Sequence, residues 1–160
     1  MAIATRIEPK LETYLEDHES RLSFNVMPGR PVEETLHVDR YEVGDRYARA
    51  HFDRSYRSTM RNSPSHLIFI SALVHTQKLL YATLCRDFGF DYDPHGPERF
   101  KMWPTKIQIR IPELITDETD LVQELWVTEL KQFNETTYRA TLETRVGSLA
   151  MEITCPVFIC

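Results

Sequence analysis

The sequence lacks the features that several large protein classes need. Its three cysteines, Cys85, Cys155 and Cys160, form no CxxC pair, so neither a disulfide framework nor a zinc knuckle is indicated. No glycine-rich nucleotide-binding motif occurs. Acidic residues outnumber basic ones by 24 to 19, and the net charge of -5 leaves no basic stripe for phosphates. We therefore expect no nucleic-acid partner.

The chain also lacks signals for export, membrane insertion or metal binding. Residues 1–10 contain no apolar run of signal-peptide length, and the most apolar stretch, 62–84, carries His75, Gln77 and Lys78. The six histidines show none of the spacings typical of metal sites. These absences predict a cytoplasmic protein with no membrane partner, no metal and no cofactor. A length of 160 residues and a hydrophobic content of 42% fit a single domain, 1–160.

The N-terminal third predicts a short helix followed by a β-hairpin. Apolar residues recur at helical spacing over residues 8–22, which predicts an amphipathic helix within an N-terminal helical extension over 1–30. From Glu33 to Tyr56 the apolar residues alternate on either side of a turn signal at 43–46. This alternation predicts two antiparallel strands.

A long apolar helix is predicted over residues 62–84. Ser63 suits the N-cap, Pro64 suits the first helical position, and Gly89 lies where a helix would stop. A helix that is apolar all round must be buried by the fold. Residues 87–104 then predict a long loop whose aromatic residues would either line a pocket or pack within the loop: Phe88, Phe90, Tyr92, Phe100 and Trp103.

The last third predicts an antiparallel meander. "TKIQIRI" alternates strictly, and three further strands follow, separated by the turns "NET" and "GS". A sheet that curls around one helix explains why that helix is apolar. The predicted class is α+β, a single hot-dog domain whose antiparallel sheet wraps around one long buried helix.

The chain resembles the hot-dog acyl-thioester enzymes, and among them the FcoT-type long-chain fatty acyl thioesterases. That group also includes enzymes that add glycine to a 2-enoyl thioester. The resemblance spans roughly residues 35–158 and rests on "YRST" at 56–59, the helix start at His66, "HTQKLLY" at 75–81 and "FNETTYRA" near the end. The chain departs from the group in a longer segment after Tyr56 and in Gln77, where asparagine is expected. The acidic helix residue of hot-dog dehydratases is missing.

Several candidate catalytic groups lie at or near the start of the predicted helix. Free N–H groups near Ser65, His66 and Leu67 would form an oxyanion hole for a thioester carbonyl. His66 could act as a base toward water or an amine, or could only cap the turn or bond a neighbouring carbonyl. Gln77 shares a helix face with His66 and could orient a water or a pantetheine amide, or be a buried amide satisfied by the sheet.

Other candidates lie before and after this helix. The Tyr56 phenol could donate to a carbonyl or carboxylate. Arg57 and Arg61 could hold a glycine carboxylate or a carrier phosphate, or lie on the surface. Trp103 is a candidate wall for the acyl group. His75 and Thr76 are interpreted as core or dimer-contact groups.

The resemblance implies an enzyme, either a thioesterase-like hydrolase or an amine-adding lyase. Its substrate would be an acyl thioester on acyl carrier protein or CoA, in fatty-acid or polyketide-type natural-product biosynthesis. Michael addition of glycine to an enoyl thioester would give a β-amino acid. The alternatives are a non-catalytic acyl-binding module and a dehydratase or isomerase that uses His66. The resemblance also implies a homodimer or a higher homo-oligomer.

Overall fold

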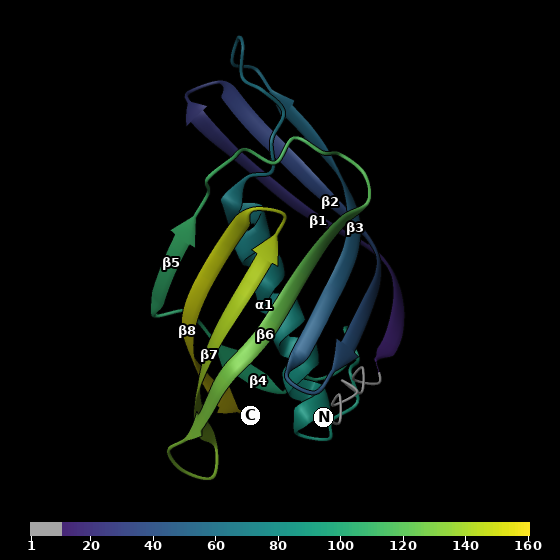
Figure 1. The fold of residues 1–160 in the computed structure, drawn as a ribbon, viewed down its shortest axis with the longest axis vertical. Helices are drawn as coiled ribbons and strands as arrows, with labels where there is room; N and C mark the ends of the chain where they lie inside the picture. Colours follow the sequence, from purple (N-terminus) through teal and green to yellow (C-terminus); the bar gives the residue numbers. More distant parts are fainter. Residues whose placement is uncertain (1–10) are drawn as a thin grey trace, which may run out of the picture.

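The computed structural model describes residues 11–160, except for the side chains of residues 15–18. One helix and eight strands follow one another along this part of the chain. Their bounds are β1 Glu12–Met27, β2 Arg30–Gly44, β3 Tyr47–Ser58, α1 Phe69–Asp87, β4 Phe100–Met102, β5 Lys106–Arg110, β6 Leu121–Gln132, β7 Thr137–Val146 and β8 Leu149–Ile159. Figure 1 shows the strands as one twisted sheet with the helix behind it.

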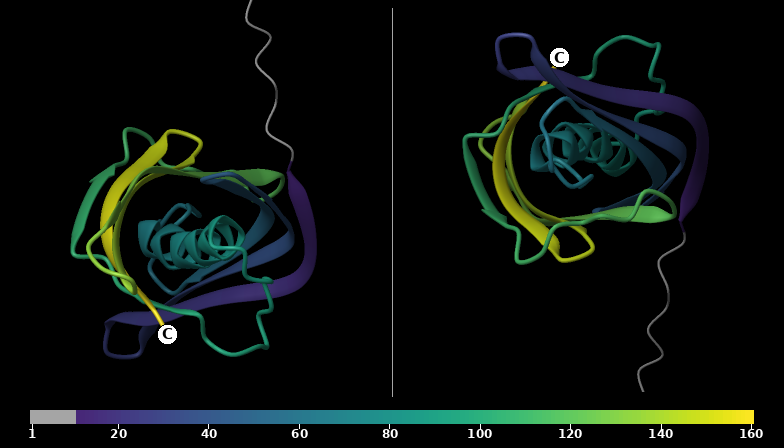
Figure 2. Two further views of the ribbon diagram at one scale, coloured as in Figure 1. Left: turned by 90° about the horizontal axis from the view of Figure 1, so that it is seen from below. Right: turned by 90° about the horizontal axis from the view of Figure 1, so that it is seen from above.

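The strands form a single antiparallel sheet that curls around α1. Its order is β1-β2-β3-β6-β7-β8-β4, and β5 also pairs with β8. Seen from its end, the sheet surrounds most of the helix (Figure 2). The predicted antiparallel sheet around one helix is therefore confirmed, and the arrangement is consistent with a hot-dog fold. The predicted hairpin corresponds to β2 and β3, and the predicted meander to β6, β7 and β8.

Alternation of apolar residues fixes which face of the sheet meets the helix. Every second residue is buried from Val32 to Val38 in β2 and from Leu121 to Val127 in β6, as side chains on one face of a strand must be when the other face meets solvent. In β2 a bulge after Val38 shifts the alternation by one residue, so that Tyr41 and Val43 are the next buried residues. The inward residues of β2, β3, β6, β7 and β8 join the inward side of α1 in one core. Leu36, Leu79, Leu125 and Leu142 are among its fully buried members.

The helix is not buried on all sides, contrary to the sequence prediction. Phe69 and Val74 keep 39% and 42% of their surface exposed, and Gln77 is exposed on the same side. Ala72 and Leu79, on the opposite side, are buried against the sheet. The curled sheet thus leaves one side of the first half of α1 open, whereas Leu84, one heptad after Gln77 on that side, is buried.

The predicted N-terminal helix is wrong for the described part of residues 8–22. Residues 12–27 form strand β1, which pairs with β2 over nearly its whole length. An edge strand needs no strict alternation, so its residues can match a helical spacing by chance. The backbone groups of β1 form hydrogen bonds with the outer edge of β2. If residues 12–27 formed an amphipathic helix, this edge of β2 would stay unpaired. Residues 8–10 lie outside the described residues.

The start of the long helix was also predicted wrongly. The helix begins at Phe69, with Ile68 as an N-cap that has no side-chain capping bond, and residues 62–68 are not helical. Tertiary hydrogen bonds hold this approach to the helix: the Leu67 N–H donates to the Ile115 carbonyl and the Ile68 N–H to the Glu34 carboxylate. Local preferences at Ser63 and Pro64 cannot compete with these bonds.

The end of the helix and the loop after it agree with the sequence prediction more closely than the helix start does. The helix ends at Asp87, and Gly89 follows with φ of 74°, a left-handed conformation that glycine adopts without strain. The predicted loop over 87–104 is mostly irregular but contains the short strand β4. In residues 11–160, no helix is long and apolar enough to span a membrane. The assignment of the whole chain to one domain stays a prediction.

Candidate functional site

A pocket of about 260 Å³ lies at the start of α1, where the extended segment 62–68 enters the helix. Tyr56, Ser63 and His66 supply its polar side chains. Its apolar wall comes from β1, from the helix start and from the segment after β5, through Phe24, Val26, Leu67, Phe69, Ile111 and Leu114. The structure therefore brings Tyr56 and His66 together, although neither lies in the helix.

The His66 imidazole has a defined tautomer in its neutral form. Nδ1 lies 2.8 Å from the Pro64 carbonyl oxygen, which can only accept a hydrogen bond, so Nδ1 carries the proton. Nε2 then holds the lone pair that a general base needs. The Tyr56 ring lies 5.5 Å from the imidazole, and the Tyr56 hydroxyl lies 3.0 Å from the Ser63 hydroxyl. A basic nitrogen and two hydroxyls thus share one apolar pocket.

The predicted oxyanion hole does not form from the amides of Ser65, His66 and Leu67. These residues precede the helix, and the Leu67 N–H already donates to the Ile115 carbonyl at 2.8 Å. The Ser65 hydroxyl donates to Glu118 at 3.2 Å. The N–H groups of Phe69 and Ile70 have no hydrogen bond to any described residue, as expected in a first helical turn. Any oxyanion stabilisation would come from these two amides.

A buried ion pair holds the backbone at Ile68, which lines this pocket. Glu34 and Arg54 have fully buried side chains, and a carboxylate oxygen lies 3.3 Å from Arg54 Nη1. The other Glu34 oxygen accepts the Ile68 N–H at 3.0 Å, immediately before α1. Burial raises the pKa of the Glu34 carboxyl above its usual value. Glu34 thus connects strand β3 to the start of the helix.

Arg54 extends the same network to the segment that precedes β6. Its guanidinium donates to the carbonyls of Ile115, Thr116 and Asp117 at 3.4, 3.1 and 2.7 Å. Its own N–H donates to the Glu118 carbonyl at 2.8 Å. Because Leu114 in this segment lines the His66 pocket, Arg54 fixes one of the pocket walls.

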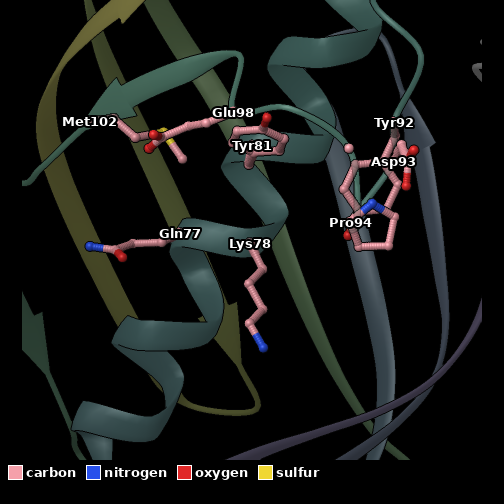
Figure 3. A pocket seen from close by; sticks show the side chains of 9 residues that line it. Gln77, Lys78, Tyr81, Tyr92, Asp93, Pro94, Glu98 and Met102 are labelled. Carbon is pink, nitrogen blue, oxygen red and sulfur yellow. The ribbon is translucent and has the colours of Figure 1, made fainter.

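The structure does not bring Gln77 to His66. Gln77 is exposed and lines a separate pocket of about 430 Å³ with Lys78, Tyr81 and residues of the loop after α1 (Figure 3). Phe69, which lines the His66 pocket, lies eight residues earlier, a rise of about 12 Å along the helix. Because Gln77 is exposed, it is also not a buried amide satisfied by the sheet, which was the alternative prediction.

The remaining predicted binding residues do not line the His66 pocket. Arg57 is exposed and lines a shallow surface pocket with Arg21 and Glu33, and Arg61 is exposed. Trp103 is 50% exposed and stacks on Phe158 at 5.1 Å between ring centroids. The aromatic residues of the loop mostly pack on one another, as in the contacts of Phe100 with Phe88 and Phe90.

His75 and Thr76 are core residues, as one of the predicted interpretations held. Both are buried beneath the sheet together with Tyr41, Gln123 and Thr144. His75 Nδ1 donates to the Gln123 oxygen at 3.0 Å, and Nε2 lies 3.2 Å from the Tyr41 hydroxyl. The Gln123 amide nitrogen lies 2.9 Å from both threonine hydroxyls. The side chains of His75 and Thr76 therefore have hydrogen-bond partners within the core.

Two of the three cysteines, Cys85 and Cys155, do not present reactive thiolates. Cys85 and Cys155 are buried, and burial raises the pKa of each thiol to about 11. Among the described residues, no group of three or more histidine, cysteine, aspartate or glutamate side chains is placed to hold a metal ion.

Comparison with known proteins gives little further information. No protein-family model matches the chain, and no curated protein sequence matches it. A crystal structure of a mutant thioesterase from Pseudomonas aeruginosa aligns with 78% of this chain and 82% of its own chain, with 9% sequence identity and a TM-score of 0.46. A likeness at this level does not assign an activity.

Proposed function

We propose that the protein binds an acyl thioester in the His66 pocket and hydrolyses it, in the manner of a hot-dog thioesterase. The observation that carries this proposal is the His66 imidazole, whose Nε2 is left basic by the bond from Nδ1 to the Pro64 carbonyl. It lies in a mostly apolar pocket at the start of a helix, where an acyl group and a developing negative charge are both favoured.

In this mechanism His66 Nε2 takes a proton from a water molecule as the water oxygen attacks the thioester carbonyl. The oxygen of the tetrahedral intermediate accepts hydrogen bonds at the first turn of α1, from the N–H groups of Phe69 and Ile70. Collapse of the intermediate breaks the carbon–sulfur bond, and the imidazolium returns its proton to the leaving thiolate. The products are a free acid and a thiol.

Hydrolysis is favoured over addition of glycine because of where the arginines lie. A glycine carboxylate near the thioester would need a cation in the same pocket. Arg57 and Arg61 are exposed and do not line the His66 pocket. The substrate is accordingly proposed to be an acyl group on CoA or acyl carrier protein that meets water.

A second candidate function is acyl binding without catalysis. It is favoured by one observation: none of the described carboxylates forms an ion pair with His66 that would orient it or stabilise its charged form. Activity measurements on one matched set of variants separate the two functions.

The test is His66→Asn, whose amide nitrogen can still donate to the Pro64 carbonyl but offers no basic nitrogen. We expect a loss of at least about 100-fold in thioester hydrolysis, the usual size of a general-base contribution. His95→Asn, in an exposed loop, is the matched control and should keep full activity. Equal rates for wild type and His66→Asn would exclude His66 as the base. Binding of a non-hydrolysable acyl thioether without any turnover in the wild type would establish the acyl-binding function instead.

We also propose that the protein forms a homodimer. Strand β5 pairs with β8 alone among the described strands, which leaves its other edge free. Ile107 and Ile109 on one face of β5, and Ile111 just after it, expose 37%, 39% and 43% of their surface. An exposed edge strand that carries apolar side chains is a surface on which a strand of another chain can pair. Light scattering should give twice the chain mass for the wild type and the mass of one chain for Ile109→Lys. A monomeric wild type at micromolar concentration would contradict the proposal.

A further inference from the structure

A second pocket, larger than the His66 pocket, is separate from it. It has a volume of about 430 Å³ and lies between the open face of α1 and the segment that leads into β4. Small-molecule sites usually enclose about 300–1,000 Å³. Figure 3 shows the helix side chains on one side and those of the loop on the other.

The loop that forms the outer wall is held at both ends. At its start the Phe90 N–H donates to the Cys85 carbonyl at 2.7 Å. At its end the Arg99 N–H donates to the Tyr81 hydroxyl at 2.8 Å, and the Cys160 N–H donates to the Arg99 carbonyl at 2.9 Å. The pocket is therefore built into the fold.

The tip of this loop is a tight turn around Asp93. The His95 N–H donates to the Asp93 carboxylate at 2.9 Å, and the Gly96 N–H donates to the Asp93 carbonyl at 3.1 Å. A Cβ atom at Gly96 would lie 2.9 Å from the Asp93 carboxylate oxygen, which is closer than real Cβ contacts. Glycine at this position thus allows the turn that brings Asp93 and Pro94 to the pocket wall.

The lining combines an apolar middle with opposite charges. The Tyr81 and Tyr92 rings meet edge to face with centroids 6.4 Å apart, and Met102 adds a thioether. In Figure 3 the Glu98 side chain extends from above Tyr81 toward Met102, whereas Lys78 extends downward from the helix. An ammonium has three N–H donors, so Lys78 can bind an anion while it keeps a contact within the protein.

We propose that this pocket binds a zwitterion with an apolar body, an ammonium at one end and a carboxylate at the other, such as an apolar dipeptide. The ammonium lies against Glu98 and the ring of Tyr81, because an aromatic face attracts cations. The carboxylate accepts from Lys78, and the Gln77 amide can donate to it as well. This binding site is independent of the proposed thioester chemistry.

Calorimetry with three related peptides tests both ends of the ligand. The probes are phenylalanyl-leucine, its N-acetyl derivative without the ammonium, and its C-terminal amide without the carboxylate. We expect the free dipeptide to bind, and each capped peptide to bind about tenfold or more weakly, because each loses one charged hydrogen bond. A fourth probe, 6-aminohexanoate, distinguishes an ω-amino acid from a peptide as the ligand.

Matched variants assign each charge to its side chain. Glu98→Gln should weaken the dipeptide about tenfold but leave the N-acetyl peptide unchanged, and Lys78→Gln should weaken the dipeptide but not the C-terminal amide. Glu135→Gln and Lys106→Gln make the same charge changes at exposed positions elsewhere and should leave the affinity unchanged. The proposal is overturned if neither zwitterion binds the wild-type protein, or if Glu98→Gln and Lys78→Gln bind the dipeptide as the wild type does.

Discussion

Replacement of Arg54 by methionine would test how the protein fixes the start of α1. Methionine fills a similar volume without charge, so the variant leaves the Glu34 carboxylate buried with no cation. It also removes the donor from the carbonyls of Ile115, Thr116 and Asp117. Removal of one partner of a buried ion pair costs about 3–5 kcal/mol, and we expect a loss of unfolding free energy in this range at pH 7.

The loss should depend on pH and on Glu34. Because the folded-state pKa of Glu34 is raised, its contribution to stability is fully present below the unfolded pKa and is lost as pH rises through the folded pKa. Without Arg54 the carboxyl is harder still to ionise, so Arg54→Met should cost less in acid than at pH 7. In the double variant Glu34→Gln/Arg54→Met no buried charge remains, and part of the loss should be recovered, with a coupling of about 0.5–3 kcal/mol.

Urea unfolding followed by tryptophan fluorescence measures these free energies. Trp126 on β6, whose ring lies 5.7 Å from that of Tyr47, reports on the sheet. Arg61→Met, at an exposed position outside the proposed dimer edge, is the matched control and should change stability by less than about 0.5 kcal/mol. A loss below about 1 kcal/mol for Arg54→Met, or losses that simply add in the double variant, would refute the reasoning.

Two further predictions concern other parts of the sheet. Gln123→Leu should lower the unfolding free energy by about 3 kcal/mol, because His75 Nδ1 and the threonine hydroxyls lose their buried partner; a change below about 0.5 kcal/mol in urea unfolding would contradict this. Hydrogen bonds from Arg49 and His51 lower the pKa of Glu42 to about 2. Its stabilising contribution, present above pH 4.5, should be lost as pH falls toward 2, and an acid titration of Glu42→Gln that matches the wild type would exclude it.

Elements with strong periodicity could be predicted from the sequence. The alternation in β2, β3, β6, β7 and β8 and the apolar length of α1 both follow from burial against one core, so their type and order were correct. Strand β1 was missed because it lies at the sheet edge, where burial imposes no clear period. The first turn of α1 was misplaced because distant residues, Glu34 and Ile115, bind the preceding N–H groups.

The site was predictable only in part, for similar reasons. Tyr56 and His66 are close in sequence and lie on either side of one connection, so their contact followed from the predicted order of elements. Gln77 was assigned to the same site from a helix that was thought to start at Ser63. Its true start at Phe69 leaves His66 outside the helix, so the two side chains share no helix face.

Two buried polar residues, Glu34 and Gln123, are marked by their place in the sequence pattern. Glu34 occupies an inward position of β2 between Val32 and Leu36, and Gln123 does so in β6 between Leu121 and Leu125. A polar residue in phase with buried apolar neighbours must find a buried partner. Their partners could not be identified from the sequence, because Arg54 and His75 come close only when the sheet curls around α1.

The most direct test of the account is a thioester assay of the wild-type protein. Saturated and 2-enoyl acyl thioesters are incubated with and without glycine, and thiol release and product mass are measured. The account predicts thiol release from the saturated substrate at a rate that glycine does not change. No thiol release from any saturated chain length, or a product that gains the mass of glycine on the enoyl substrate alone, would contradict hydrolysis at the His66 pocket.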